Sequence, residues 1–420
     1  MNGNFLYERI LQESLVTALG DTPAVLIHGP RQCGKSTLAL HVGEALGYRY
    51  VTFDDDTVRA SARVDPVGFV AALPERTILD EVQRAPDLFT ALKVAIDRDR
   101  RPGRFILTGS SNVLLLPQLA DSLAGRMEVL RLHPLAQVEM AGSRPHFIEA
   151  LFARRFSGAP AARLGGELIA RIVAGGYPAA IARTVPARRA AWYRDYITTL
   201  VQRDVRDLAR ISALDALPRL LEMAAGQTAR LINVADLAAP FQLSRPTIRD
   251  YVTLLTNLFL LDQLPAWHSN RLSRLVKTPK LHMGDTGLAC ALLGLNDAVL
   301  EADRTLLGQL LETFVYQELH RQAGADDGSL KFHHLRDKDG VEVDIVIERS
   351  GRGIAGVEVK AAASVTSSDF NGLRKLQRTT GDRFAAGVVL YDGEATLSFG
   401  ERLYALPLRL LWEESAGTRE

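Results

Sequence analysis

The sequence predicts a multidomain α/β protein, and three observations support this prediction. The chain has 420 residues, and single hydrophobic cores stop growing at roughly 250–300 residues. Apolar residues make up 47% of the chain and charged residues 24%, which is typical of globular proteins rather than disordered ones. Over the first 150 residues, short apolar runs alternate with helical runs, and this order predicts a parallel sheet covered by helices.

The composition also indicates the cellular compartment of the protein. Its two cysteines, Cys33 and Cys290, are far apart and lack metal-ligand spacing, which favours a reducing cytosol. Glu8 and Arg9 interrupt the region where a signal peptide needs its apolar core. No apolar run reaches the ~18 residues that span a bilayer. We expect a cytoplasmic protein without membrane contact, and the net charge of +1 neither indicates nor excludes nucleic-acid binding.

Residues 24–40 combine an apolar strand, a loop and a helical run, and the loop spells G-x-x-x-x-G-K-S. A loop around a phosphate needs glycine freedom where successive backbone N–H groups turn inward, here at Gly29 and Gly34. Lys35 would reach the β- and γ-phosphates, and Ser36 would bind Mg²⁺. The pattern therefore predicts binding of ATP and Mg²⁺, against the alternative of a chance match in a turn. The predicted nucleotide-binding residues are Gly29, Pro30, Arg31, Gln32, Cys33, Gly34, Lys35, Ser36 and Thr37.

Two further apolar strands end in polar residues. Residues 77–81 end in Asp80, which would hold Mg²⁺, and Glu81, which would polarise the attacking water. Residues 104–112 end in Ser110, Ser111 and Asn112, which we expect near the γ-phosphate. Strands over 48–54 and 127–132 would complete the sheet, with the site at the strands' carboxyl ends.

Arg126 lies just before the last of these strands. Phosphoryl transfer needs positive charge near the γ-phosphate, so Arg126 would act either in cis or toward a neighbouring subunit. The alternative is an arginine placed at a helix C-terminus by the helix dipole.

The segments GPRQCGKST, LDEVQ, LTGSSN, SLAGR, GGYP and QRDV together resemble one branch of the prokaryotic AAA-type P-loop ATPases. In that branch the ATPase domain precedes a C-terminal domain of unknown function with a restriction-endonuclease-like fold. The resemblance covers nearly the whole chain. It implies an AAA-like ATPase domain over residues 1–150 and ATP binding, and a homo-oligomer would fit it.

The middle of the chain predicts two helical parts. Residues 151–212 contain periodic helical runs, and a helical lid over the nucleotide is the natural assignment. Arg203 or Arg206 could face the nucleotide there, although a solvated helix face, or a patch touching a neighbouring domain, is the better explanation for any single arginine.

Residues 213–279 predict a winged-helix-like module. Asn233 and Ser244 are placed to cap two helices, and the run LFLLDQLPAW over 258–267 could form the wing strand. Arg245, Thr247 and Arg249 would remain on the outer side of the second helix, so DNA would meet the helix over 244–250 and the nearby arginines. A protein-interaction or linker module is the alternative. The basic segment 271–287 could extend the same surface toward nucleic acid, and a solvated linker explains it equally well.

Residues 280–420 form the predicted restriction-endonuclease-like domain. Such folds use a helix glutamate, a strand aspartate and E-x-K on the next strand, and the resemblance assigns these roles to Glu312, Asp344, Glu358 and Lys360. The three carboxylates would bind Mg²⁺ and the lysine would orient the water. Thr313 departs from the amide expected beside the helix glutamate.

The hairpin over 342–360 allows a geometric prediction. If its turn is centred on Gly351, Asp344 lies opposite Glu358, and Glu342 lies opposite Lys360. Directly opposed carboxylates cost roughly 0.2–1 kcal/mol, and a bound cation would reverse that sign. The sequence thus predicts a metal-capable pair of facing carboxylates.

Taken together, these patterns predict a Mg²⁺-dependent ATPase that couples its nucleotide state to DNA binding or processing. The alternative is an ATP-controlled regulatory or scaffold switch whose nuclease-like domain is inactive.

Overall fold

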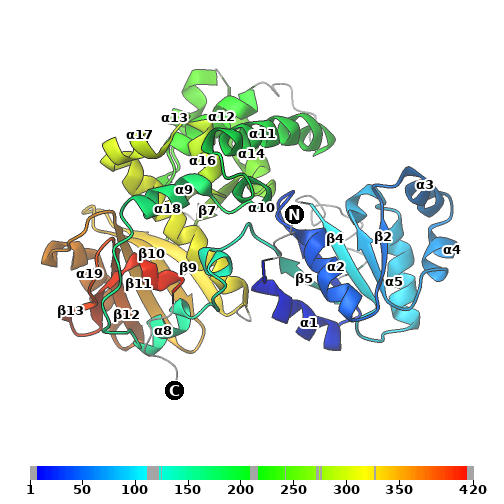
Figure 1. Ribbon diagram of the computed structural model, residues 1–420, viewed down its shortest axis with the longest axis horizontal. Helices are drawn as coiled ribbons and strands as arrows, with labels where there is room; N and C mark the ends of the chain where they lie inside the picture. The colour runs from blue at the N-terminus through cyan, green and yellow to red at the C-terminus, as the bar shows by residue number, and fades with distance from the viewer. Residues whose placement is uncertain are drawn as a thin grey trace. The chain divides into compact units, whose positions relative to one another are not determined.

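A five-stranded parallel sheet lies at the centre of the N-terminal part of the computed structural model (Figure 1). The structure describes residues 7–110, 123, 125–208, 216–241, 243–270, 274, 277–325 and 328–413, and only the backbone of 201–208. The strand order is β2-β3-β4-β1-β5, and every neighbouring pair is parallel. The predicted parallel sheet is therefore confirmed. Its strands are β1 (Ala24–His28), β2 (Arg49–Thr52), β3 (Thr77–Asp80), β4 (Phe105–Gly109) and β5 (Met127–Arg131).

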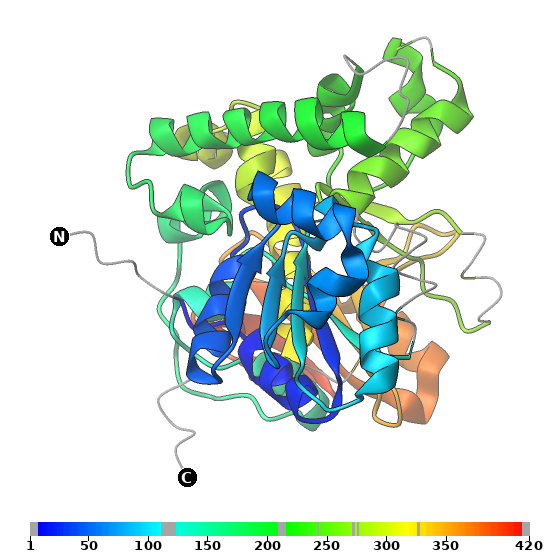
Figure 2. The same cartoon turned by 90° about the vertical axis from the view of Figure 1, so that its right-hand side faces the viewer.

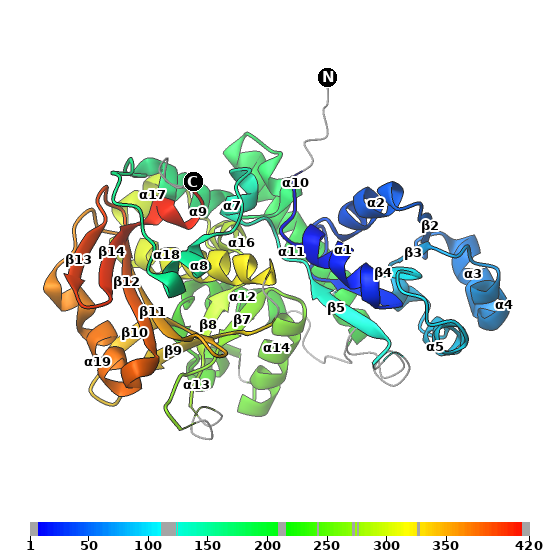
Figure 3. The ribbon, with the colours of Figure 1, turned by 90° about the horizontal axis from the view of Figure 1, so that it is seen from below.

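Both faces of this sheet are covered, because successive side chains of a strand point to opposite sides. Val25 and Ile27 pack in a core with helices α1 (Leu11–Asp21) and α2 (Lys35–Ala45). Ala24 and Leu26 belong to the opposite core, which takes in helices α3 (Asp56–Val64), α4 (Pro66–Ala71) and α5 (Leu88–Arg98). Figure 2 shows the strands side by side, and Figure 3 shows them between the two groups of helices.

The chain forms two compact units, with a boundary between Leu135 and Ala136. Unit 1 holds the parallel sheet together with Asn257–Phe259, and unit 2 holds the rest of the chain. The division of the chain into an ATPase domain, lid, winged-helix-like module and nuclease-like domain at residues 150, 212 and 279 stays a prediction. No described helix is long and apolar enough to cross a membrane.

Unit 2 begins with helices and a small antiparallel sheet of order β6-β8-β7. Both predicted caps are confirmed, because Asn233 accepts from the N–H of Ala235 and Ser244 from that of Thr247. The elements are α7 (Gln137–Met140), α8 (Phe147–Ala153), α9 (Gly166–Ala174), α10 (Pro178–Ile181), α11 (Pro186–Leu208), α12 (Ala216–Gly226), β6 (Arg230–Leu231), α13 (Val234–Ala238), α14 (Arg245–Asn257), β7 (Leu261–Leu264), β8 (Lys280–Met283), α16 (Thr286–Leu292) and α17 (Asp297–Ala302).

The C-terminal part of unit 2 is a six-stranded mixed sheet of order β13-β14-β12-β11-β10-β9. Helix α18 (Arg304–Gln322) carries Glu312 and begins after Asp303, whose carboxylate caps it by accepting from the N–H groups of Thr305 and Leu306. From Leu307 onward, most of its side chains are buried, on nearly every side of the helix. The remaining elements are β9 (Leu330–Arg336), β10 (Glu342–Arg349), β11 (Gly353–Lys360), α19 (Asn371–Thr380), β12 (Phe384–Tyr391), β13 (Leu397–Gly400) and β14 (Leu403–Pro407).

Candidate functional site

The loop after β1 has the backbone freedom that the glycine spacing predicted. A Cβ atom at Gly29 would lie 2.1 Å from the backbone oxygen of Leu132, so no larger residue fits without moving the chain. Gly34 has a φ of +103°, in the region that favours glycine. Of the other predicted residues in this loop, Pro30 and Cys33 are buried, Arg31 and Ser36 are half-buried, and Gln32 and Thr37 are exposed.

Lys35 begins α2 and is almost fully buried. Its Nζ donates to the backbone oxygens of Gly29 and Pro30, at 3.1 and 2.8 Å. The ammonium therefore lies inside the turn of the loop, where phosphate oxygens would be stronger acceptors than these carbonyls.

Asp80 ends β3 and collects hydroxyl donors from three elements. Ser36 Oγ donates to its Oδ1 at 2.6 Å, and Thr108 Oγ1 donates to the same oxygen at 2.5 Å. Tyr50 Oη donates to Oδ2 at 2.8 Å. Burial, and the hydrogen bond to Asp80, raise the pKa of Tyr50 to about 12. Asp80 is thus oriented beside Ser36, as the predicted Mg²⁺ role requires.

Glu81 and Ser110 are linked at the tips of β3 and β4. Gln83 Nε2 donates to Ser110 Oγ at 2.9 Å and also to Glu81 Oε2. The N–H of Glu81 donates to Thr108 Oγ1 at 3.2 Å, and Glu81 has a φ of +58°. A non-glycine residue in this left-handed region is strained. The chain therefore changes direction directly after β3, at the residue that carries the candidate catalytic carboxylate. Ser111 and Asn112 lie outside the described residues.

The sequence motifs did not identify four residues of this site: Arg9, Tyr50, Gln83 and Thr108. Arg9 donates to the backbone oxygens of Cys33 and His133, at 2.8 and 2.6 Å, and so braces the phosphate-binding loop from outside. Gln83 lies within the LDEVQ segment, but its role depends on a contact with the next strand. Only the sheet order brings these side chains to one site.

Arg126 lies just before β5, at the edge where the parallel strands begin. Its guanidinium pairs with Asp97 of α5, with N–O distances of 2.7 and 2.9 Å. The phosphate-binding loop follows the opposite end of β1, and Ala24 of β1 pairs with Met127. A strand of this length separates the two by about 15 Å, which argues against contact between Arg126 and a nucleotide in the same subunit.

The residues present fit a Mg²⁺–nucleotide complex. The loop turns around a buried ammonium, and a hydroxyl and a carboxylate that suit Mg²⁺ lie together at its end. Because Ser36 and Asp80 are already in contact, little rearrangement is needed to share an ion or its water shell.

The four residues assigned to the endonuclease-like site also lie together in unit 2. In the hairpin, Ile345 pairs with Val357 and Ile347 with Ala355, which is the predicted register around Gly351. Continued by one residue, this register would place Asp344 opposite Glu358. Burial together with Asp344 raises the pKa of Glu358 well above its ordinary value.

The ion pairs of this cluster differ from those expected. Lys360 lies 3.8 Å from Glu358, while Glu342 contacts Arg336 and the buried Lys280 instead of Lys360. Lys280 comes from the segment interpreted as a nucleic-acid surface or solvated linker. Its Nζ also lies 2.6 Å from Glu312 and 3.4 Å from Asp344.

Burial and Asp344 raise the pKa of Glu312 well above its ordinary value, although Lys280 opposes this shift. Among the described residues, no group of three or more His, Cys, Asp or Glu side chains is arranged to hold a metal ion. The assignment of Glu312, Asp344 and Glu358 as metal ligands therefore stays a prediction.

Three protein families match successive parts of the chain. Residues 21–141 match the AAA domain family, residues 166–299 a domain of unknown function (DUF8612), and residues 307–411 a domain of unknown function (DUF4143). Uncharacterized proteins of Mycobacterium tuberculosis and Mycobacterium bovis are each 31% identical over 393 residues, covering 93% of this chain and 81% of theirs. The chain belongs to the AAA-type ATPases that carry a C-terminal DUF4143 domain.

Two solved structures are similar to parts of this AAA-type ATPase. The Walker-type ATPase Paby2304 of Pyrococcus abyssi is 14% identical, with 68% of this chain and 96% of that chain covered, at a TM-score of 0.44. The Holliday junction branch migration motor RuvB of Thermotoga maritima is 19% identical, with 61% and 89% covered, at a TM-score of 0.28.

Beyond its phosphate-binding loop, the ATPase has a second concave feature, within unit 2. A cavity of about 550 Å³ lies between α13, α14 and β7. Arg245, Arg249 and Lys277 line it, together with the amides of Asn233 and Gln263, and none of its lining residues is acidic. Within the described part of the chain, no ion pair is seen for the three cations.

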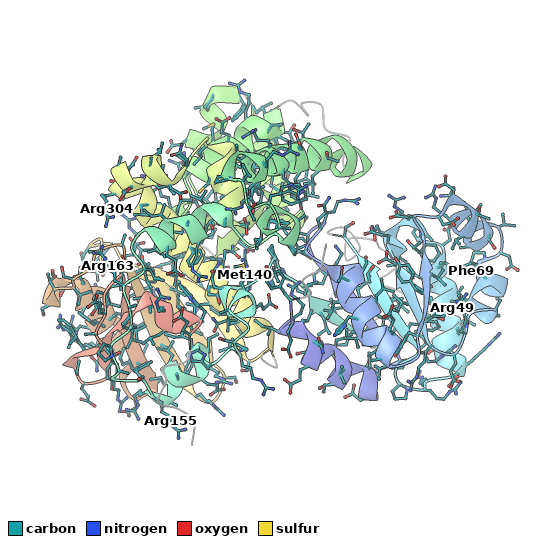
Figure 4. The ribbon with its side chains drawn as sticks, in the orientation of Figure 1. Arg49, Phe69, Met140, Arg155, Arg163 and Arg304 are labelled. Atoms are coloured by element: carbon teal, nitrogen blue, oxygen red, sulfur yellow. The ribbon has the colours of Figure 1, made fainter. Side chains whose placement is uncertain are left out.

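The GGYP segment of the ATPase has a structural partner. Asp285 accepts from the N–H of Gly176 at 2.7 Å and from Tyr193 Oη at 3.1 Å, and it pairs with Arg321 at 3.2 Å. A Cβ atom at Gly175 would lie 2.2 Å from the Asp285 carboxylate, so the glycine makes room for this contact. Arg163, labelled in Figure 4, makes a comparable ion pair with Asp392.

Proposed function

We propose that this ATPase couples Mg²⁺-dependent ATP hydrolysis in unit 1 to nucleic-acid binding by unit 2. The observation that carries the coupling to nucleic acid is the basic cavity between α13, α14 and β7.

In unit 1, Lys35 would turn from the loop carbonyls to the β- and γ-phosphates, and Ser36 and Asp80 would hold Mg²⁺. Bound Mg²⁺ would offset phosphate charge. Glu81 is the candidate base for the attacking water, and Gln83 couples its position to that of Ser110. Because Arg126 lies at the far edge of the sheet, its charge would serve the nucleotide of a neighbouring subunit, which implies a homo-oligomer.

In unit 2, Arg245 and Arg249 are four residues apart on α14 and therefore share one face of the helix. Lys277 approaches the same cavity from the segment before β8. Three cations in a cavity whose described lining holds no carboxylate favour a phosphate backbone. Gln263, which is exposed and lines the same cavity, could then contact a base edge.

Fluorescence anisotropy with labelled duplex DNA, at several salt concentrations and with or without ATP, tests this proposal. We expect Arg249→Ala to weaken binding and to reduce the salt dependence by about one counterion. Arg378→Ala, which removes an exposed helix arginine outside the cavity, is the matched control and should leave affinity unchanged. Equal binding by wild type and an Arg245→Ala/Arg249→Ala double variant would refute the proposed surface.

A regulatory switch with an inactive nuclease-like domain is the second candidate function. The buried Lys280 among the carboxylates of the C-terminal cluster favours it. The two candidates differ in ATP turnover and in cleavage. A switch would hydrolyse ATP slowly until a partner is added and would leave DNA uncleaved. A processing enzyme would cleave DNA in an assay that depends on ATP.

A further inference from the structure

One ammonium group lies at the centre of the C-terminal carboxylate cluster. Lys280 is the first residue of β8, and its side chain is 2% exposed. Its Nζ lies 2.6 Å from Glu312 Oε1 on α18 and 2.6 Å from Glu342 Oε1 on β10. Asp344 Oδ1, also on β10, lies 3.4 Å away. Three carboxylates from two elements therefore converge on this one cation.

This ammonium lies where the predicted metal ion would be. A divalent ion shared by Glu312 and Asp344 would need oxygen ligands at roughly 2.0–2.6 Å. The Lys280 nitrogen already lies within hydrogen-bond distance of both carboxylates, so an ion could bind only after the lysine left. A buried lysine that leaves three carboxylates would lose the partners that offset its desolvation.

The other contacts of the cluster are consistent with a site that is complete without metal. Glu342 has no place in the metal-binding pattern of the endonuclease-like fold, yet it makes one of the two shortest contacts to Lys280. The second oxygen of Asp344 accepts from the N–H of Val359 at 3.0 Å. Lys360 faces Glu358 at 3.8 Å. Each of these carboxylates thus has a cationic or N–H partner from the protein.

We propose that Lys280 is the built-in cation of this cluster, replacing a divalent metal ion and fastening β8 to α18 and β10. The cluster then recruits no Mg²⁺ in the native chain, and the DUF4143 domain acts through its shape and contacts rather than by metal-activated water. This inference stands on the cluster's own geometry and is independent of whether unit 2 binds DNA.

Mn²⁺ binding to the full chain, measured by electron paramagnetic resonance without nucleotide, tests the inference. An Asp80→Ala background removes the Mg²⁺ ligand of the phosphate-binding loop, so that any ion found belongs elsewhere. In that background we expect no Mn²⁺ bound when Lys280 is present. Lys280→Ala should gain one Mn²⁺ per chain, and its melting temperature should rise when Mn²⁺ is added.

Lys360→Ala is the matched control, because it removes a lysine of the same cluster that contacts Glu358 alone. It should gain no Mn²⁺. Stoichiometric Mn²⁺ binding by the Lys280-containing chain that disappears on Asp344→Asn would overturn the inference, and so would a folded Lys280→Ala protein that binds none. If Lys280→Ala does not fold, the chain with Lys280 and its Asp344→Asn variant still decide between the two outcomes.

Discussion

Replacing Thr108 by valine tests how Asp80 and Glu81, the candidate Mg²⁺ ligand and candidate catalytic base of unit 1, are held. Thr108 is fully buried, and valine has nearly its shape. The change removes a 2.5 Å hydrogen bond to Asp80 and leaves the N–H of Glu81 without its 3.2 Å acceptor. A hydrogen bond to a charged group contributes about 1.5–3 kcal/mol, and an unsatisfied buried N–H costs about 1–3 kcal/mol. Because water can replace part of this loss, we expect unit 1 to lose about 2–4 kcal/mol of unfolding free energy.

Thr108→Val should also weaken the affinity of the site for Mg²⁺. Removing a group that orients a metal-binding carboxylate typically costs about 10–100-fold in metal affinity or activity, so a Mg²⁺ titration of steady-state ATP hydrolysis should shift by that factor. Thr77→Val is the control, because Thr77 is equally buried at the other end of β3, where its hydroxyl donates to Pro74. Thr77→Val should lose stability but keep the wild-type Mg²⁺ dependence. A Thr108→Val protein with wild-type Mg²⁺ dependence would refute this account of the site.

Three other outcomes follow from the geometry. Arg126→Ala should abolish ATP turnover alone, and mixing it with Lys35→Ala subunits should restore part of the activity if the arginine serves a neighbour's nucleotide; no recovery would contradict this. Burial, with Arg131 and Lys35, lowers the pKa of His28 to about 4. As pH falls below about 6.5, the imidazole of His28 therefore takes up a proton in the unfolded chain before it does so in the folded one. The free energy of unfolding should drop by on the order of 3 kcal/mol between pH 6.5 and 4. In denaturant titrations, His28→Asn should lack this part of the pH dependence. Asp285→Asn should destabilise unit 2 by about 3–5 kcal/mol in the same titrations, because it neutralises the buried carboxylate that pairs with Arg321; a loss under 1 kcal/mol would argue against this ion pair.

Local patterns predicted the features that neighbouring residues determine. Glycine spacing located the phosphate-binding loop, polar residues at helix starts located the caps Asn233 and Ser244, and alternation about Gly351 gave the hairpin register. Each depends on residues within a few positions of one another, where backbone geometry limits the outcomes.

Residues that act across elements escaped prediction. Tyr50 and Thr108 have no characteristic spacing from Asp80, because parallel neighbours in a sheet are joined by connections of variable length. Lys280 looked like one more basic residue in a polar segment. Its charge is buried because α18 and β10 present carboxylates to β8. These carboxylates lie more than 30 residues away in the sequence, so the residues around position 280 do not predict them.

The Asp285 contacts bear on how this protein can be divided. Asp285, Gly176 and Tyr193 fall within the DUF8612 match, whereas Arg321 falls within the DUF4143 match. A fragment that starts at residue 307 would expose the Arg321 guanidinium. It would also lack Lys280 and therefore the ion pair between Lys280 and Glu312. The boundary between the two family matches therefore does not divide the side-chain packing, so residues 136–420 should be expressed and studied as one piece.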